Sequence, residues 1–281
     1  DEITLSVLAA IEPSLRMAEI DRVKRKRPEN LHAYDLVLRA LPFAMTRMPT
    51  GAETAIPLLH QAIALDATYV MAHAALAWCY HALYYRAARR PEHDAAAIHH
   101  ARAVLDLGSD DATALSLAAF ALAMSTDRDH ETGLSLFDRA IHLSPSSVLA
   151  WGYSAMLLAY AGRTEEAIRR AERALRLSPF DWHSFVAHQS LAVACFLAGR
   201  FEESAEAARR AVQVNPGYSL AHAYLAAALA RLGRTDQAGM AGKQVLALEP
   251  QFTIRSLEGF FPDPNDWASL AAAMRLARLP D

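Results

Sequence analysis

The chain has 281 residues, of which 53% are hydrophobic and 21% charged, and its formal net charge is -3. This composition supports a packed core and excludes a disordered chain. The near balance of charge argues against a protein whose main task is to neutralise nucleic-acid phosphates. Two cysteines, Cys79 and Cys195, are too few for a disulfide scaffold and favour a reducing compartment, the cytoplasm.

The N-terminal segment, residues 1–29, is expected to form a linker helix. Its apolar residues recur at helical spacing and end in a basic run at residues 22–27. Pro13 should kink or break the helix. We interpret the basic run as a solvated helix end, where positive charge is favourable next to the helix dipole, and contact with phosphate or anionic lipid is the alternative. The sequence starts at Asp1 without a signal-peptide pattern or an apolar run long enough to span a bilayer, so we expect a piece of a longer cytoplasmic protein.

From residue 30 to residue 250 the chain repeats one unit. The stretch "AGRTEEAIRRAERALRLSP" ends at Pro179, and related stretches end at Pro145, Pro216 and Pro250, with spacings of 34, 37 and 34 residues. Gly108 and Ala67 are weaker anchors of the same kind. Small residues recur five and twelve positions before each anchor, where they allow two helices to lie close together. The proline then ends the second helix.

These offsets predict six helix pairs, in which a glycine supplies the tight turn of each of the last three. A period near 34 with this pattern resembles tetratricopeptide repeats. We therefore expect an all-α tetratricopeptide superhelical solenoid with an N-terminal helix and a C-terminal capping helix. The predicted pairs are about 31–47/52–65, 69–87/93–107, 112–125/130–143, 147–161/164–177, 183–198/201–214 and 218–232/235–248.

The C-terminal segment, residues 251–281, departs from the repeat. Asp263 can cap a helix that begins at Pro264, and an apolar side of this helix is expected from Trp267, Leu270, Met274 and Leu276. Because a solenoid needs an atypical terminal element over its last core face, this segment is the predicted cap.

The opening "DEITLSVLAAIEPSLRMAEIDRVKRKRPENLHAYDLVLRAL", the repeats and the closing "FTIRSLEGFFPDPNDWASLAAAMRLARLP" together resemble one family region. It is the tetratricopeptide tail of bacterial class III adenylate cyclases, and similar regions follow winged-helix regulators of the invasion-regulator kind. The resemblance implies the interaction tail of a multidomain signalling protein. The catalytic aspartates and the recognition helix of those families have no counterpart here. A free-standing scaffold or adaptor without an effector domain is the alternative.

Motifs of catalytic chemistry are missing from the sequence. It has no G-x-x-x-x-G-K-[ST], H-E-x-x-H, G-x-S-x-G or C-x-x-C, so we expect no catalytic residues, no metal and no cofactor. His73, His188 and His222 fall near the starts of first helices, where they should pack between repeats and not bind metal.

The scaffold is instead expected to bind a protein or peptide through an apolar concave groove on the first helices, or a second copy of the chain, and no nucleic acid. Two alternatives stay open: these residues are core between repeats, or the chain's own terminal segment fills the groove. The predicted groove residues are Met71, Trp78, Leu115, Leu122, Leu149, Met156, Tyr160, Val186, Gln189, Val193, Phe196 and Leu220.

Overall fold

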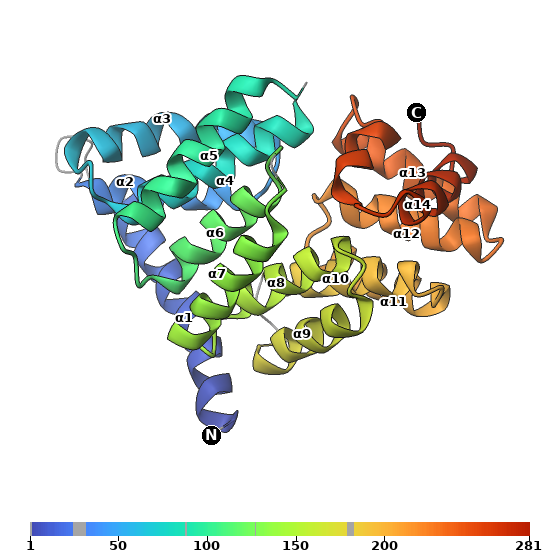
Figure 1. Ribbon diagram of the computed structural model, residues 1–281, viewed down its shortest axis with the longest axis horizontal. Coiled ribbons are helices and arrows are strands. Elements are labelled where there is room, and N and C mark those ends of the chain that lie inside the picture. The colour runs from blue at the N-terminus through green and yellow to red at the C-terminus, as the bar shows by residue number, and fades with distance from the viewer. Residues whose placement is uncertain (1, 25–31, 88, 127, 179–182) are drawn as a thin grey trace. The chain divides into compact units, whose positions relative to one another are not determined.

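The computed structural model describes residues 2–24, 32–87, 89–126, 128–178 and 183–281 (Figure 1). Throughout these ranges the regular structure is helical, as the sequence predicts. The chain divides into two compact units, Asp1–Ala150 and Trp151–Asp281. The predicted division into a linker helix at residues 1–29, a repeat array at 30–250 and a capping segment at 251–281 stays a prediction.

The helix pairs follow the predicted order, and each bound lies within three residues of the expected one. The first unit starts with α1 (Glu2–Lys24), which packs against α2. Its pairs are α2 (Ala33–Ala44) with α3 (Pro49–Leu65), α4 (Val70–Arg86) with α5 (Pro91–Asp106), and α6 (Ala112–Ala123) with α7 (His130–Leu143).

The remaining pairs belong to the second unit, apart from the first three residues of α8. They are α8 (Val148–Tyr160) with α9 (Thr164–Leu177), α10 (Ser184–Leu197) with α11 (Phe201–Val214), and α12 (Ser219–Arg231) with α13 (Thr235–Leu248).

Small residues make the close helix packing. Ala174 and Ala211, each five positions before its anchor, are fully buried, and so is Ser204, twelve positions before. In the second pair the buried positions are Ala97 and Val104, one residue later than the sequence register predicts. The tight turns of the last three pairs use Gly162, Gly199 and Gly233 at φ 75°, 74° and 72°, the left-handed region that favours glycine.

Prolines inside three helices do not interrupt them. Residues Glu2–Lys24 form one helix across position 13, so the expected break there is absent. Pro42 and Pro57 likewise lie within α2 and α3. Of the basic run at residues 22–27, positions 25–27 lie outside the described residues.

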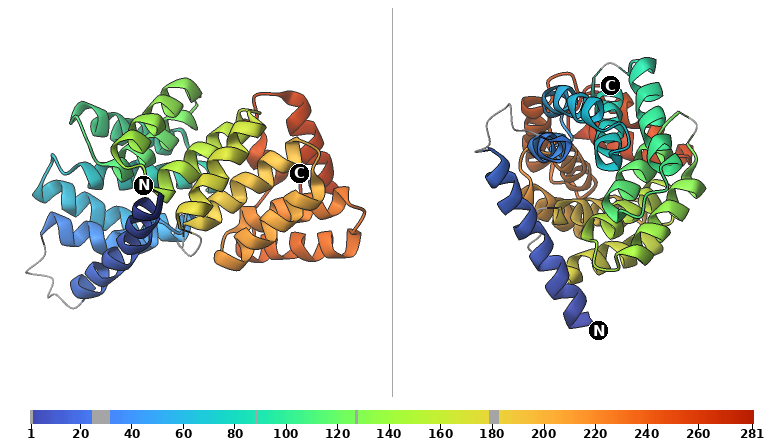
Figure 2. Two further views of the ribbon diagram at one scale, coloured as in Figure 1. Left: turned by 90° about the horizontal axis from the view of Figure 1, so that it is seen from below. Right: turned by 90° about the vertical axis from the view of Figure 1, so that its left-hand side faces the viewer.

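The C-terminal segment forms a 3-10 helix, η2 (Ile254–Phe260), and then α14 (Pro264–Leu276). Asp263 is confirmed as the N-cap residue of α14, because its carboxylate accepts a hydrogen bond from the Asn265 backbone amide at 2.7 Å. Figure 2 shows α14 in red beside the helices of the last pair. It packs mainly against α12, with smaller contacts to α13 and α10, whereas α12 itself packs mainly against its own pair partner α13 and then against the preceding α11. The segment therefore lies across the first helices and does not simply add one more repeat.

Candidate partner-binding surfaces

Most of the predicted groove residues are interior. Only Met71 and Leu122 are partly exposed. The first helices are apolar on nearly every side, so their apolar residues pack within the chain and do not form an open groove. Binding by the buried side chains stays a prediction, and it would require the structure to open. The ten buried residues are Trp78, Leu115, Leu149, Met156, Tyr160, Val186, Gln189, Val193, Phe196 and Leu220.

In the second unit the C-terminal segment covers part of this face. Phe260 stacks on Tyr160 with ring centroids 5.0 Å apart, and Phe261 meets the same ring edge-on at 5.5 Å. Tyr160 is consequently only 3% exposed. Since α14 also contacts α10 and α12, the alternative in which the chain's own terminal segment fills the predicted groove applies here.

In the first unit an arginine covers the predicted groove residue Trp78. The Arg47 guanidinium lies 4.9 Å from the centroid of Trp78 and 5.1 Å from that of Phe120, in cation–π geometry. His81 contacts both aromatic rings. Burial lowers the pKa of His81, and the positive charges of Arg47 and Arg86 lower it further. This cluster is therefore a neutral histidine packed among aromatic rings and arginines, inside the protein.

An open cavity of about 370 Å³ remains in the first unit, between α1, α2 and the first residues of α4. Its floor is Val37, Leu38 and Leu41, all buried in α2. Met71, one of the two partly exposed predicted residues, lines its wall. The cavity is thus one place where a predicted groove residue remains accessible.

The rim of the cavity is polar. It contains the phenols of Tyr34 and Tyr69 and the carboxylates of Glu19 and Asp111. Burial raises the pKa of Tyr69 to about 12, with further contributions from the nearby Tyr34 and Asp111. Tyr69 is therefore a neutral phenol that can donate a hydrogen bond. Sequence reasoning missed these residues because they come from four separate parts of the chain.

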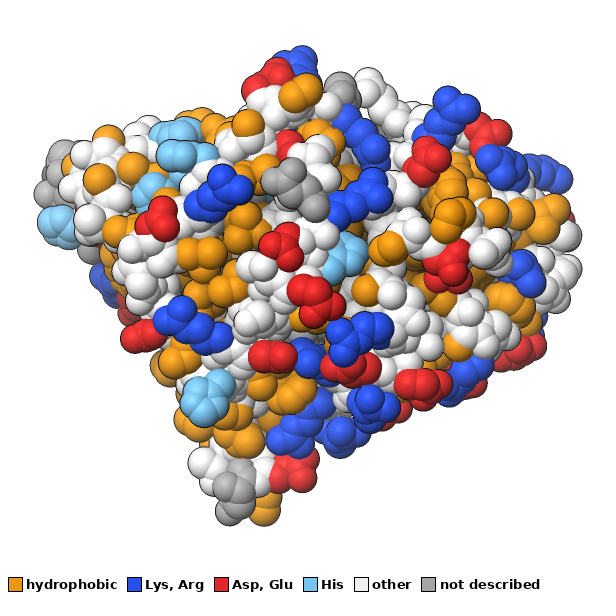
Figure 3. All heavy atoms as spheres, viewed as in Figure 1, with side chains coloured by type: hydrophobic (Ala, Val, Ile, Leu, Met, Phe, Trp, Pro, Cys, Tyr) orange, Lys and Arg blue, Asp and Glu red, His pale blue; other side chains and the backbone are white. Residues whose placement is uncertain are grey.

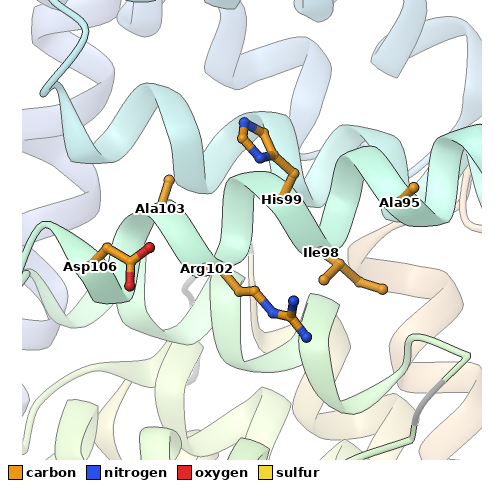
Figure 4. A pocket seen from close by; sticks show the side chains of 6 residues that line it. All are labelled: Ala95, Ile98, His99, Arg102, Ala103 and Asp106. Atoms are coloured by element: carbon orange, nitrogen blue, oxygen red, sulfur yellow. The ribbon is translucent and has the colours of Figure 1, made fainter.

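A second hollow, of about 490 Å³, runs along the outer face of α5 (Figure 4). The side chains that line it follow each other at helical spacing on one side of α5, and they carry charges of both signs. On the face shown in Figure 3, basic and acidic side chains are likewise interspersed. Both the hollow and this face therefore carry charges of mixed sign.

Two of the three histidines near the starts of first helices hydrogen-bond to the loop that precedes their own helix. The ring Nε2–H of His73 donates to the Ala67 carbonyl at 3.1 Å, and that of His222 donates to the Pro216 carbonyl at 3.0 Å. Each carbonyl lies six residues before its histidine, so two of the three predicted histidines make equivalent contacts. His188 lies one position further into its helix and is half-buried, and the residue six positions before it lies outside the described ranges.

His73 also meets His100 through their Nδ1 atoms at 3.0 Å. With Nε2–H of neutral His73 engaged by the carbonyl, its Nδ1 accepts, and Nδ1–H of His100 donates. Burial lowers the pKa of His100 to about 4, and the neighbouring histidines add to this effect. In the part of the chain that the structure describes, no three His, Cys, Asp or Glu side chains are grouped so that they could hold a metal ion.

The two cysteines are buried and free. Burial raises the pKa of Cys79 to about 12 and that of Cys195 to about 11, so both are protonated thiols near neutral pH and weak nucleophiles. Within the described ranges, no helix combines the length and the apolar character that crossing a bilayer requires.

No family model matches the chain. A 94-residue part, 34% of the chain, is 28% identical to the Protein STIP1 homolog of Dictyostelium discoideum, of which it spans only 16%. Among solved structures, the human IFIT1 dimer with m7Gppp-AAAA matches 79% of this chain and 51% of its own, with a TM-score of 0.63 and 15% identity.

Two further structures match a large part of the chain. PilW, a type IV pilus biogenesis factor, matches 80% of this chain and 96% of its own, with a TM-score of 0.55 and 17% identity. The Cut9–Hcn1 hetero-tetramer matches 92% of this chain and 48% of its own, with a TM-score of 0.59 and 12% identity. At these identities the similarities concern the fold alone. Together with the observed helix pairs and their period, they make this chain a helical-repeat protein of the tetratricopeptide type.

Proposed function

We propose that the chain is a non-catalytic protein-interaction module and acts in the cytoplasm as the tail of a bacterial multidomain signalling protein, an adenylate cyclase or a transcriptional regulator. The fold supports the interaction role, since tetratricopeptide arrays present stacked helices to protein or peptide partners. The resemblance of the sequence to the tails of those two families supports the assignment to a multidomain signalling protein. A free-standing scaffold is the second candidate.

The observation that carries the proposal is the open cavity of the first unit, which combines a buried apolar floor with a polar rim. Binding sites are concave and mostly apolar, with a few polar groups that set orientation. The apolar floor and the polar rim of this cavity therefore suit the binding of a partner segment.

Purified chain should retain a specific protein from an extract of its own cells, and the two purified proteins should form a complex of defined stoichiometry in calorimetry. It should form no cyclic nucleotide and shift no DNA selectively at physiological salt. Sedimentation would show whether the partner is a second copy. Failure to form any stoichiometric complex would overturn the interaction role, and turnover of ATP to cyclic AMP would overturn the non-catalytic one. The upstream reading frame decides between a tail and a free-standing scaffold.

A further inference from the structure

The cavity of the first unit combines two kinds of surface. Val37, Leu38 and Leu41 form a buried apolar floor, and Leu15 of α1, 63% exposed, extends the apolar surface outward. This extent of apolar wall suits a chain of several methylene groups and gives no hydrogen bonds to its middle.

The rim of the cavity is anionic and aromatic. Asp111 and Glu19 are the charged residues of its described lining, which contains no lysine, arginine or histidine. Arg22, outside the lining, holds Glu19 at 2.8 Å, so part of that charge is compensated. Asp111 is different, because the backbone amides of Thr113 and Ala114 both donate to its Oδ1, at 2.8 and 2.9 Å.

The second oxygen of Asp111, Oδ2, accepts no hydrogen bond within the described ranges and remains open to a ligand. Tyr34 and Tyr69 line the same cavity. Tyr69 is close enough to both Tyr34 and Asp111 for their charges to affect its pKa. Aromatic faces and carboxylates both attract a cation, and they do so more strongly where the cation loses water.

We propose that this cavity binds the side chain of a lysine or arginine from the partner segment, with its methylene stem on the floor and its cationic head at Asp111 and the tyrosines. The proposal rests on the interaction role and names the chemistry of the partner. Lysine and arginine have both an apolar stem and a charged head. An acidic side chain would meet Asp111 as a like charge, and a purely apolar one would leave the rim without a partner.

Three six-carbon probes with different heads test the proposal directly on the full chain: n-hexylammonium, 1-hexanol and hexanoate. The reporter is the methyl group of Met71, which lines the cavity, followed by carbon–proton NMR. The exposed Met240 serves as an internal reference for nonspecific binding. We expect saturable shifts at Met71 with n-hexylammonium, with an affinity about tenfold higher than that of 1-hexanol, as one charge-assisted hydrogen bond provides. Hexanoate should produce no saturable shift.

The decisive variant is Asp111→Asn, since asparagine caps a helix about as well as aspartate. Its matched control is Asp129→Asn, which removes one charge from the cap of α7 and leaves the cavity unchanged. Asp111→Asn should lower the n-hexylammonium affinity about tenfold, and Asp129→Asn should leave it unchanged. Thermal melts of both variants verify folding.

Equal affinity for the three probes, or equal loss in the two variants, would overturn the proposal. So would a gain in affinity for both n-hexylammonium and the uncharged 1-hexanol after Arg25, Lys26 and Arg27 are all replaced by serine, because a neutral probe gains only if the chain's own basic run had occupied the cavity. These results are separate from partner capture. A chain that captures a protein but fails the probe test keeps its interaction role and loses this site.

Discussion

Met156 decides whether the apolar face of the first helices is core or groove. It is 0% exposed in α8, whereas Met240 on α13 is 69% exposed. Glutamate is close to methionine in size, so the substitution leaves little cavity. Its cost is that of taking a carboxylate out of water, several kcal/mol unless the carboxylate becomes protonated. We therefore expect Met156→Glu to lower the free energy of unfolding by at least about 4 kcal/mol, a large share of the stability of a typical domain.

The assay is urea unfolding followed by circular dichroism at the helix band, with two control variants. Met240→Glu should change the free energy of unfolding by less than about 0.5 kcal/mol, as exposed substitutions usually do. Met156→Leu nearly conserves volume and should cost less than about 1.5 kcal/mol. If Met156→Glu is as stable as Met240→Glu while partner binding is lost, the side chain faces a groove, and the core assignment is wrong.

Three further predictions test the fold. Gly233→Ala should lower the free energy of unfolding by about 1 kcal/mol, because alanine is strained at φ 72°, whereas Gly239→Ala inside α13 should raise it by about 0.5 kcal/mol. Thermal melts that shift the melting temperature in the same direction for both variants would contradict this. Because the folded state lowers the pKa of His81 below 6.5, the unfolded chain binds the extra proton. The melting temperature should therefore fall from about pH 7 to pH 5, and His81→Phe should reduce that fall; an unchanged fall would remove His81 as its cause. Phe260→Ala should lower the free energy of unfolding by about 3 kcal/mol and increase the accessibility of Tyr160 to acrylamide quenching. An unchanged free energy of unfolding would show that the C-terminal segment contributes little to the stability of the second unit.

Local signals in the sequence were sufficient to predict where the helices begin and end. Small residues at fixed offsets, turn glycines and terminating prolines act within a few residues of themselves, so the pair bounds and the Asp263 cap follow from the sequence. The second pair lacks a terminal proline and a turn glycine like Gly162. There the register was misread by one position, and Ala97 and Val104 are the buried residues.

Whether an apolar face is interior or exposed was decided only by tertiary structure. A helical stripe such as the one through Met156 and Tyr160 reads the same whether it meets a partner or the chain's own Phe260. The cavity shows the same limit, because Glu19, Tyr34, Tyr69 and Asp111 carry no joint signal in the sequence. They converge because α1 packs against α2 and successive first helices stack, and contacts between residues far apart in the chain leave no periodic trace in the sequence of either one.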